Sequence, residues 1–214
     1  MKKSVAVVGL GRFGNSVAKE LYTSGSDVLV IDENQEKIDD IANFVTCAIR
    51  LDICDPRALE EAGIGDMDVV IVAMSESLEA SIMAIMTAKA LNVKSVIAKA
   101  KDEFMGAILE KLGADQIIYP EKESGIRLCH KVVSSNFIDY FDISDTTSLV
   151  EMYPRQEWIG KSLRQLDLRK KYKVNVVAVM QNDDFNIAMD PDEPLKAEEK
   201  LLLTIKKKDL KRIE

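Results

Sequence analysis

A glycine-rich loop near the amino terminus is the first candidate site. Residues Gly9 to Gly14 form a G-x-G-x-x-G string that follows a short apolar run and precedes a helical pattern. An acid, Asp32, ends the next apolar run, 18 residues after Gly14. In this dinucleotide-binding context, Gly9 permits a tight turn, Gly11 lets the backbone approach a phosphate, and Gly14 lets the helix pack close to the sheet. The N–H groups at the helix start would attract the anion, and Asp32 would accept hydrogen bonds from ribose hydroxyls.

Arg12, inside this loop, carries a charge that the local structure does not favour. A cation near a helix N-terminus is opposed by the helix dipole. A phosphate partner removes that conflict, because the guanidinium adds a charge-assisted fork to the anion site. Such a fork suits the terminal phosphate of ATP or ADP at least as well as a bridging pyrophosphate. The alternative is an arginine turned into solvent.

Further polar residues follow other apolar runs of the sequence. Ligands bind outside the carboxyl ends of parallel strands, so we expect Asp52 near the base or ribose, and residues 74–76 and Lys99 on the rim. Glu121 either holds a divalent cation or bridges a phosphate, or is only a first-turn acid favoured by the helix dipole. The predicted nucleotide site comprises Gly9, Gly11, Arg12, Phe13, Gly14, Asp32, Asp52, Met74, Ser75, Glu76, Lys99 and Glu121.

The elements that must position these residues follow an α/β pattern. Short runs rich in Val and Ile, without alternation, predict strands covered on both faces, and helical segments separate them. The fold class is therefore α/β, with a Rossmann-like, parallel, six-stranded sheet wound by crossover helices. The predicted strands are residues 4–8, 27–31, 45–50, 68–73, 95–98 and 116–119, and the predicted helices are residues 13–24, 35–43, 56–62, 77–92 and 103–112.

A longer helix and a second, smaller domain follow. The helix, 121 to about 136, has Ile126, Cys129, Val133 and Phe137 at helical spacing. This apolar stripe packs either on its own domain or on a partner subunit. We place the domain boundary after residue 138, so that residues 1–138 include this crossover helix and residues 139–214 form a small α+β domain. Its predicted strands are 140–143, 148–153, 174–180, 185–188 and 201–206, with a helical turn at 163–166 and a turn at 182–184.

Composition narrows the function classes. The 29 basic and 36 acidic residues give a net charge of −7, which disfavours nucleic acid as a partner. The sequence lacks an apolar run long enough to span a membrane and lacks a signal peptide, so we expect a cytoplasmic protein. The three cysteines show no C-x-x-C spacing, and we expect them to be small buried thiols.

Catalytic residues are not evident in the sequence. The lone histidine, His130, is distant from the glycine loop, and we expect it to be packed or at the surface. The sequence does not contain a G-x-x-x-x-G-K-[ST] phosphate-binding loop, the motif that would suggest nucleotide hydrolysis. We therefore expect a binding module and no enzyme. Two alternatives stay open: an NAD-dependent oxidoreductase using Lys99, a tyrosine or a carboxylate for proton transfer, and an NADH-binding redox sensor.

The sequence resembles a known family, the RCK or KTN proteins (TrkA-N plus TrkA-C), and most of all the KtrA type. Members of this family are cytoplasmic regulatory subunits of potassium transport. The stretches that resemble the family cover nearly the whole chain and are residues 7–14, 30–32, 70–73, 109–115 and 118–123.

The resemblance implies a function, partners and residue roles. It implies dimers that assemble into a homo-octameric ring. The ring docks at the inner face of the membrane on a separate potassium-translocating subunit. ATP and ADP favour different shapes of the ring and thereby regulate that subunit. By the same resemblance Arg12 contacts the terminal phosphates, Asp32 the ribose, Asp52 the adenine side, and Glu121 a cation shared with the nucleotide. KtrA-type proteins also bind cyclic di-AMP in the C-terminal domain, and the matching positions are Leu163, Asp167, Arg169, Asn175 and Pro191. A solvated basic turn would explain residues 169–171 equally well.

Overall fold

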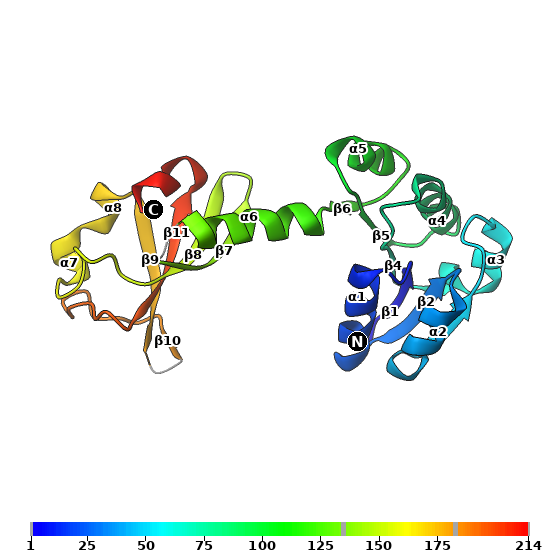
Figure 1. Cartoon of the computed structure of the whole chain (residues 1–214), viewed down its shortest axis with the longest axis horizontal. Helices are drawn as coiled ribbons and strands as arrows, with labels where there is room; N and C mark the ends of the chain where they lie inside the picture. Colours follow the sequence, from blue (N-terminus) through cyan, green and yellow to red (C-terminus); the bar gives the residue numbers. More distant parts are fainter. Residues whose placement is uncertain (1, 134–135, 182–183, 214) are drawn as a thin grey trace. The chain divides into compact units, whose positions relative to one another are not determined.

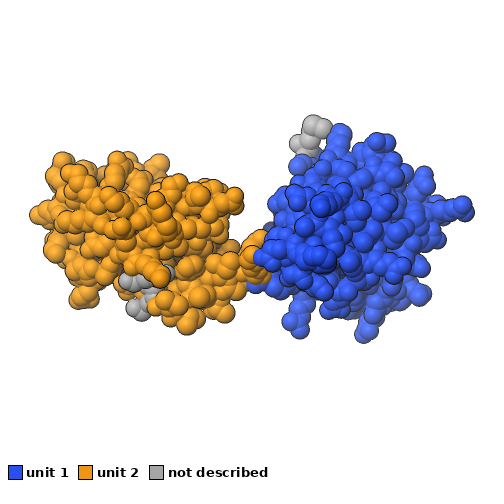
Figure 2. Space-filling view, turned by 90° about the horizontal axis from the view of Figure 1, so that it is seen from above, with its two compact units in different colours: residues 1–121 blue, residues 122–214 orange. Residues whose placement is uncertain are grey.

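The structure, a computed structural model, describes residues 2–133, 136–181 and 184–213. The chain divides into two compact units, residues 1–121 and 122–214 (Figure 2). Each unit has its own sheet and its own core. The domain boundary after residue 138 stays a prediction, since compactness alone does not define a functional domain.

The first unit is built on a six-stranded parallel sheet, as predicted. Its order is β3-β2-β1-β4-β5-β6, so β1 lies between β2 and β4 and the chain changes direction across the sheet after β3 (Figure 1). Ligands bind at such a switch point, beyond the carboxyl ends of the strands. The strands are β1 (Ser4–Val8), β2 (Asp27–Asp32), β3 (Cys47–Arg50), β4 (Val69–Val72), β5 (Ser95–Lys99) and β6 (Gln116–Ile118).

Five helices connect these strands, and most begin at a capping side chain. Asn34, Asp55, Ser77 and Asp102 each accept backbone N–H bonds from the first turn that follows them. The helices are α1 (Arg12–Thr23), α2 (Gln35–Ile41), α3 (Pro56–Glu61), α4 (Leu78–Ala90) and α5 (Glu103–Lys111), with short 3₁₀ turns at Ala42–Phe44 and Ile64–Asp66. The helix predicted to run to residue 43 therefore ends earlier, in a 3₁₀ turn.

The apolar runs without alternation are explained by two cores, one on each face of the sheet. Val5 and Val7 of β1 pack with the residues of α1 and α2. Ala6 and Val8 pack instead with α3, α4 and α5. Both faces of the sheet are therefore buried, which removes any need for polar residues in the strands.

The second unit is an α+β unit around a five-stranded antiparallel sheet of order β10-β9-β11-β8-β7. Its core includes Trp158, Val150, Leu201 and Leu203, all with no exposed surface. Its elements are the helix α6 (Pro120–Val133), which begins in the first unit, then β7 (Phe137–Ser144), β8 (Thr147–Met152), α7 (Leu163–Leu166), α8 (Leu168–Lys171), β9 (Val174–Gln181), β10 (Asp184–Asn186), β11 (Lys200–Lys206) and a 3₁₀ helix (Lys207–Arg212).

Two predictions about apolar residues are wrong. Phe137, placed on the stripe of the long helix, is the first residue of β7 and is buried there. The cysteines are not buried thiols: Cys47 lies exposed on the edge strand β3, Cys129 lies exposed on α6, and Cys54 is half-buried.

Other differences lie at element ends. The helix α8 was not predicted, because Asp167 separates it from α7 in a left-handed conformation (φ 44°) that sequence periodicity does not reveal. The strand predicted at 185–188 ends at Asn186, and residues 182 and 183 of the predicted turn lie outside the described residues. Within the described ranges, no helix combines the length and the apolar content that crossing a membrane requires.

Candidate functional site

A cleft of about 720 Å³ opens in the first unit where β1, β2 and β4 end. Ten of the twelve predicted site residues line it, and Gly14 and Asp52 do not. The switch point of the sheet thus brings together residues that are far apart in the sequence. The lining is Gly9, Gly11, Arg12, Phe13, Asp32, Glu33, Lys37, Ile53, Ala73, Met74, Ser75, Glu76, Ser77, Ala80, Lys99 and Glu121.

The glycine turn joins β1 to α1 with little room to spare. Gly9 adopts a left-handed φ of 95°, which favours glycine, and its N–H donates to the Ile31 carbonyl at 2.8 Å. Gly14 faces this turn from α1, and a Cβ added there would lie 2.0 Å from the Gly9 carbonyl oxygen. Gly14 therefore determines how closely α1 approaches the end of β1, although Gly14 itself does not line the cleft.

The N-terminus of α1 is open toward the cleft. Gly11 is the N-cap and supplies no side-chain cap, and a Cβ added there would meet nothing within 4 Å. The first N–H groups of a helix have no intrahelical partner, so this end presents donors and a partial positive charge. Arg12 is exposed beside it, and no carboxylate of the described residues pairs with its guanidinium. The arrangement suits an anion.

Asp32 is already surrounded by donors. The residue is 6% exposed; Oδ2 accepts from the Leu10 N–H at 2.7 Å, and Oδ1 accepts from the Asn34 N–H at 2.9 Å. The ammonium of Lys37 adds a third donor, 3.2 Å from Oδ2 and 3.5 Å from Oδ1. Lys37 comes from the first turn of α2, five residues after Asp32.

Lys99 and Glu121 form an ion pair at the other end of the cleft. Their Nζ and Oε1 lie 2.6 Å apart, with the lysine side chain 10% exposed and the carboxylate 70% exposed. The hydrogen bond from Lys99 lowers the pKa of Glu121 below its ordinary value, outweighing a small effect of burial. The lysine ammonium also lies 5.9 Å from the centre of the Phe13 ring.

Glu121, the carboxylate of this ion pair, is also the predicted metal ligand. Across the described residues, no group of three or more His, Cys, Asp or Glu side chains could hold a metal ion. A single carboxylate fits a cation that a nucleotide mostly ligates, since magnesium is often held by one or two carboxylates and phosphates. The role of Glu121 as a metal ligand stays a prediction.

Asp52 lies apart from the cleft, contrary to the place expected for it. It is exposed, and its Oδ1 accepts from the Cys54 N–H at 2.8 Å, which closes a local turn. The next residue, Ile53, is buried and lines the cleft in its place. The wall at this end is therefore apolar, which suits the face of a base more than its polar edge.

Six lining residues were not predicted from the sequence: Glu33, Lys37, Ile53, Ala73, Ser77 and Ala80. For Lys37 a signal existed, because a lysine in the first turn of a helix opposes the dipole, as Arg12 does. Ile53, Ala73 and Ala80 gave no such signal, since their apolar types are equally those of core residues. With Arg12, Lys37 and Lys99 as cations and four carboxylates in the lining, the cleft has slightly more negative than positive charge.

A second cleft, of about 350 Å³, lies within the second unit. Its lining contains all five residues that resemblance placed at a cyclic dinucleotide site: Leu163, Asp167, Arg169, Asn175 and Pro191. The guanidinium of Arg169 donates to the Asn175 carbonyl oxygen. Arg164 is also in the wall, where Asp192 accepts from its Nε at 2.6 Å and from its Nη2 at 3.1 Å. Of the two guanidiniums, that of Arg169 is therefore the one without a carboxylate partner among these residues.

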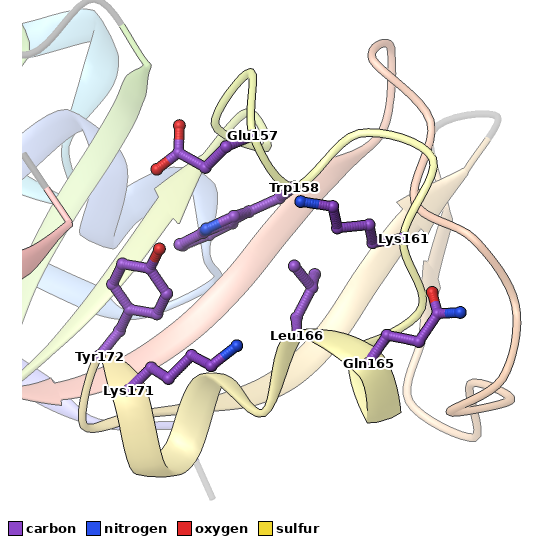
Figure 3. A pocket seen from close by; sticks show the side chains of 7 residues that line it. All are labelled: Glu157, Trp158, Lys161, Gln165, Leu166, Lys171 and Tyr172. Carbon is purple, nitrogen blue, oxygen red and sulfur yellow. The ribbon is translucent and has the colours of Figure 1, made fainter.

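A third cavity, of about 410 Å³, surrounds Trp158 (Figure 3). The indole is fully buried and packs edge to face with Tyr172, with ring centres 5.0 Å apart. Its Nε1 has no hydrogen-bond partner within the described part of the chain, and it is shielded from solvent as well, so it offers no donor to a ligand in the cavity. Lys161 and Lys171 reach in from the two sides (Figure 3). We interpret this cavity as a feature of the packing around Trp158.

Comparison with family models defines the class to which this fold and cleft belong. Residues 5–120 match the TrkA-N domain and residues 149–214 match the TrkA-C domain. The chain belongs to this family, and the resemblance stated from its sequence is confirmed.

Individual relatives are similar over most or all of the chain. One is the Ktr system potassium uptake protein C of Bacillus subtilis, 35% identical over 100% of this chain and 97% of its own length. Another is the Ktr system potassium uptake protein A of Vibrio alginolyticus, 36% identical over 88% of this chain and 86% of its own length. Among solved structures, the GsuK channel bound to NAD has the same fold, with a TM-score of 0.66 and 14% identity over 100% of this chain and 39% of that chain. This chain thus spans less than half of that channel.

Proposed function

We propose that this chain is a nucleotide-binding regulatory subunit of a separate membrane protein that conducts potassium, with ATP and ADP as its ligands. The observation that supports this most is the cleft of the first unit, in a chain similar from end to end to Ktr potassium uptake proteins A and C. In this proposal the nucleotide acts by being exchanged, and the chain is not an enzyme.

The geometry of the cleft favours a nucleotide with a terminal phosphate. The open N-terminus of α1 and the unpaired guanidinium of Arg12 lie on one side, and the carboxylate of Asp32 lies where β2 ends. The phosphates would meet the first two groups and the ribose the third, while Ile53 supports the base. Because the lining holds four carboxylates against three cations, a triphosphate would bind best with a divalent cation, for which Glu121 is the proposed ligand.

The competing proposal is an NADH-binding redox sensor, or an oxidoreductase. Asp32 and the glycine turn serve a dinucleotide as well as ATP, and the pyrophosphate of NADH would lie at the same helix end. Arg12 is the residue that favours the mononucleotide, because a guanidinium fork matches a terminal phosphate.

A second ligand, cyclic di-AMP, is proposed for the cleft of the second unit. Arg169 supplies a guanidinium for a phosphate, and Leu163, Pro191 and Leu168 supply apolar surface for the bases. The gathering of the five expected residues in one cleft supports this proposal.

The assembly is also a proposal: homodimers that form a homo-octameric ring, held at the inner face of the membrane by the potassium-translocating subunit. The helix α6 supports it, because none of its residues is buried within the chain, while Leu128, Val132 and Val133 are 62%, 76% and 65% exposed. Exposed apolar surface of this kind marks an interaction site. In this scheme residues 1–138 bind the nucleotide and residues 139–214 bind the regulator.

Calorimetric titration of the purified chain with ATP, ADP, NADH and cyclic di-AMP tests these proposals. We expect ATP and ADP to bind, Arg12→Ala to weaken both, and Lys111→Met, an exposed lysine at the end of α5, to leave binding unchanged. Binding of NADH with no response to ATP or ADP would overturn the proposal in favour of a dinucleotide sensor. Consumption of NADH with a small carbonyl compound would point to the oxidoreductase.

A further inference from the structure

A lysine outside the glycine motif lies at the place where the ribose is expected. Lys37 Nζ is 3.2 Å from Asp32 Oδ2 and 3.5 Å from Oδ1, and both side chains line the cleft. The carboxylate is almost fully buried, whereas the lysine side chain is 44% exposed. The carboxylate is therefore fixed and the ammonium is free to adjust.

The hydrogen bonds at Asp32 limit how a ribose can bind. A carboxylate has about four lone-pair sites, and here two accept from backbone N–H groups and the others face Lys37. The backbone donors of Leu10 and Asn34 cannot leave without unfolding the turn. A hydroxyl that donates to Asp32 must therefore take its place beside the Lys37 ammonium.

We propose that Lys37 and Asp32 together recognise the ribose 2′-hydroxyl, with Lys37 as the hydrogen-bond donor and Asp32 as the acceptor. In this arrangement the 2′-hydroxyl donates its proton to the carboxylate, and its oxygen accepts from the ammonium. An ammonium has three protons, so Lys37 keeps one hydrogen bond to Asp32 while donating another to the ribose. This inference rests on the proposed nucleotide function and adds to it a specificity for ribonucleotides over 2′-deoxyribonucleotides.

The discrimination follows from what a missing hydroxyl leaves behind. With a 2′-deoxynucleotide, the bond from the hydroxyl to Asp32 and the bond from Lys37 to its oxygen are both missing, and sites built around a hydroxyl reject analogues that lack it. A role of Lys37 that is only structural, such as stabilising α2, would weaken ribonucleotide and deoxyribonucleotide equally. The ratio of the two affinities separates these cases.

The test is calorimetric titration of the full-length chain with ATP and with 2′-deoxy-ATP, for wild type, Lys37→Met, Lys37→Arg and the control Lys111→Met. In the wild type we expect 2′-deoxy-ATP to bind at least tenfold more weakly than ATP. Lys37→Met should lower this ratio about threefold or more, mainly by weakening ATP, because the bond from the ammonium to the hydroxyl oxygen is lost. The discrimination that remains comes from the bond of the hydroxyl to Asp32. Lys37→Arg and Lys111→Met should keep the wild-type ratio.

Failure of the role of Lys37 and failure of the proposed function would give different results. A ratio that Lys37→Met leaves unchanged, or a wild type that binds both nucleotides equally, overturns the role of Lys37 while leaving the proposed function intact. A wild type that binds neither nucleotide overturns the proposed function, and this inference with it. Thermal unfolding of each variant shows whether the fold is retained.

Discussion

Two glycines at the start of α1, Gly11 and Gly14, should respond differently to substitution by alanine. A Cβ at Gly14 would lie 2.0 Å from the Gly9 carbonyl oxygen, which is backbone and cannot rotate away. Overpacking of this kind costs about 1–3 kcal/mol, and a backbone obstacle places Gly14→Ala near the upper end. For a first unit of 121 residues, about 3 kcal/mol corresponds to a fall of about 10 °C in Tm.

Gly11→Ala should keep the fold and lose the ligand. Gly11 has φ −69° and ψ −178°, which alanine adopts without strain, and its added methyl meets no atom within 4 Å. The substitution should therefore change Tm little, because alanine reduces the entropy of the unfolded chain but is a poorer N-cap residue than glycine. The same methyl would stand where a phosphate approaches the backbone. Losing one hydrogen bond to a charged group, about 1.5–3 kcal/mol, weakens binding about 10- to 100-fold.

Thermal unfolding and calorimetric titration with ATP, run on both variants, test this pair of expectations. The reasoning is refuted if Gly11→Ala binds ATP as tightly as the wild type, because the phosphate then lies elsewhere. It is equally refuted if Gly14→Ala unfolds at the wild-type temperature, because α1 then does not depend on its close approach to the turn.

Arg12→Ala should weaken ATP binding at least tenfold with Tm unchanged, because the side chain is exposed and has no carboxylate partner among the described residues; an equal loss for the control Lys111→Met would contradict this. Arg169→Ala should weaken cyclic di-AMP binding about tenfold and leave ATP binding unchanged, as two separate titrations would show. Burial raises the pKa of Tyr140 to about 12, so its protonated form stabilises the fold below pH 10 and this contribution is lost between about pH 10 and about pH 12; Tyr140→Phe should flatten the alkaline fall in Tm. Lys99→Met should raise the pKa of Glu121 toward its ordinary value, measured by carboxyl-carbon NMR titration, and no change would show that the ion pair does not form in solution.

The sequence was a good guide wherever one local interaction decides the structure. All six strands of the first unit were expected, because strands buried on both faces must be apolar throughout. The glycine turn and Asp32 were expected because strand, turn and helix follow one another directly. Asp52 shows where this reasoning fails: its place after a strand was visible, but its side chain accepts from the Cys54 N–H and does not line the cleft. Only the tertiary structure shows which of two neighbouring residues, Asp52 or Ile53, lines the cleft.

For α6 too, the sequence predicted only part of what the structure shows. Helical spacing identified an apolar stripe but did not show what covers it, and in the structure none of the residues of α6 is buried. The stripe also continued in the sequence to Phe137, which belongs to a strand, because periodicity has no signal for the end of a helix when no glycine or proline marks it.

The state of the cations in the cleft decides which of them can supply affinity. Lys37 and Lys99 are each paired with a carboxylate, Asp32 and Glu121 respectively. For either lysine, binding a phosphate exchanges one ion pair for another, so the net gain is small. The Arg12 guanidinium and the N-terminus of α1 have no such partner among the described residues, and for them an arriving phosphate is a new interaction. Affinity should therefore depend mainly on Arg12 and the helix end, whereas the lysines should determine which nucleotide is accepted. Arg12→Ala should accordingly reduce ATP affinity more than Lys99→Met does, and the reverse order would mean that the ion pair of Lys99 opens at little cost.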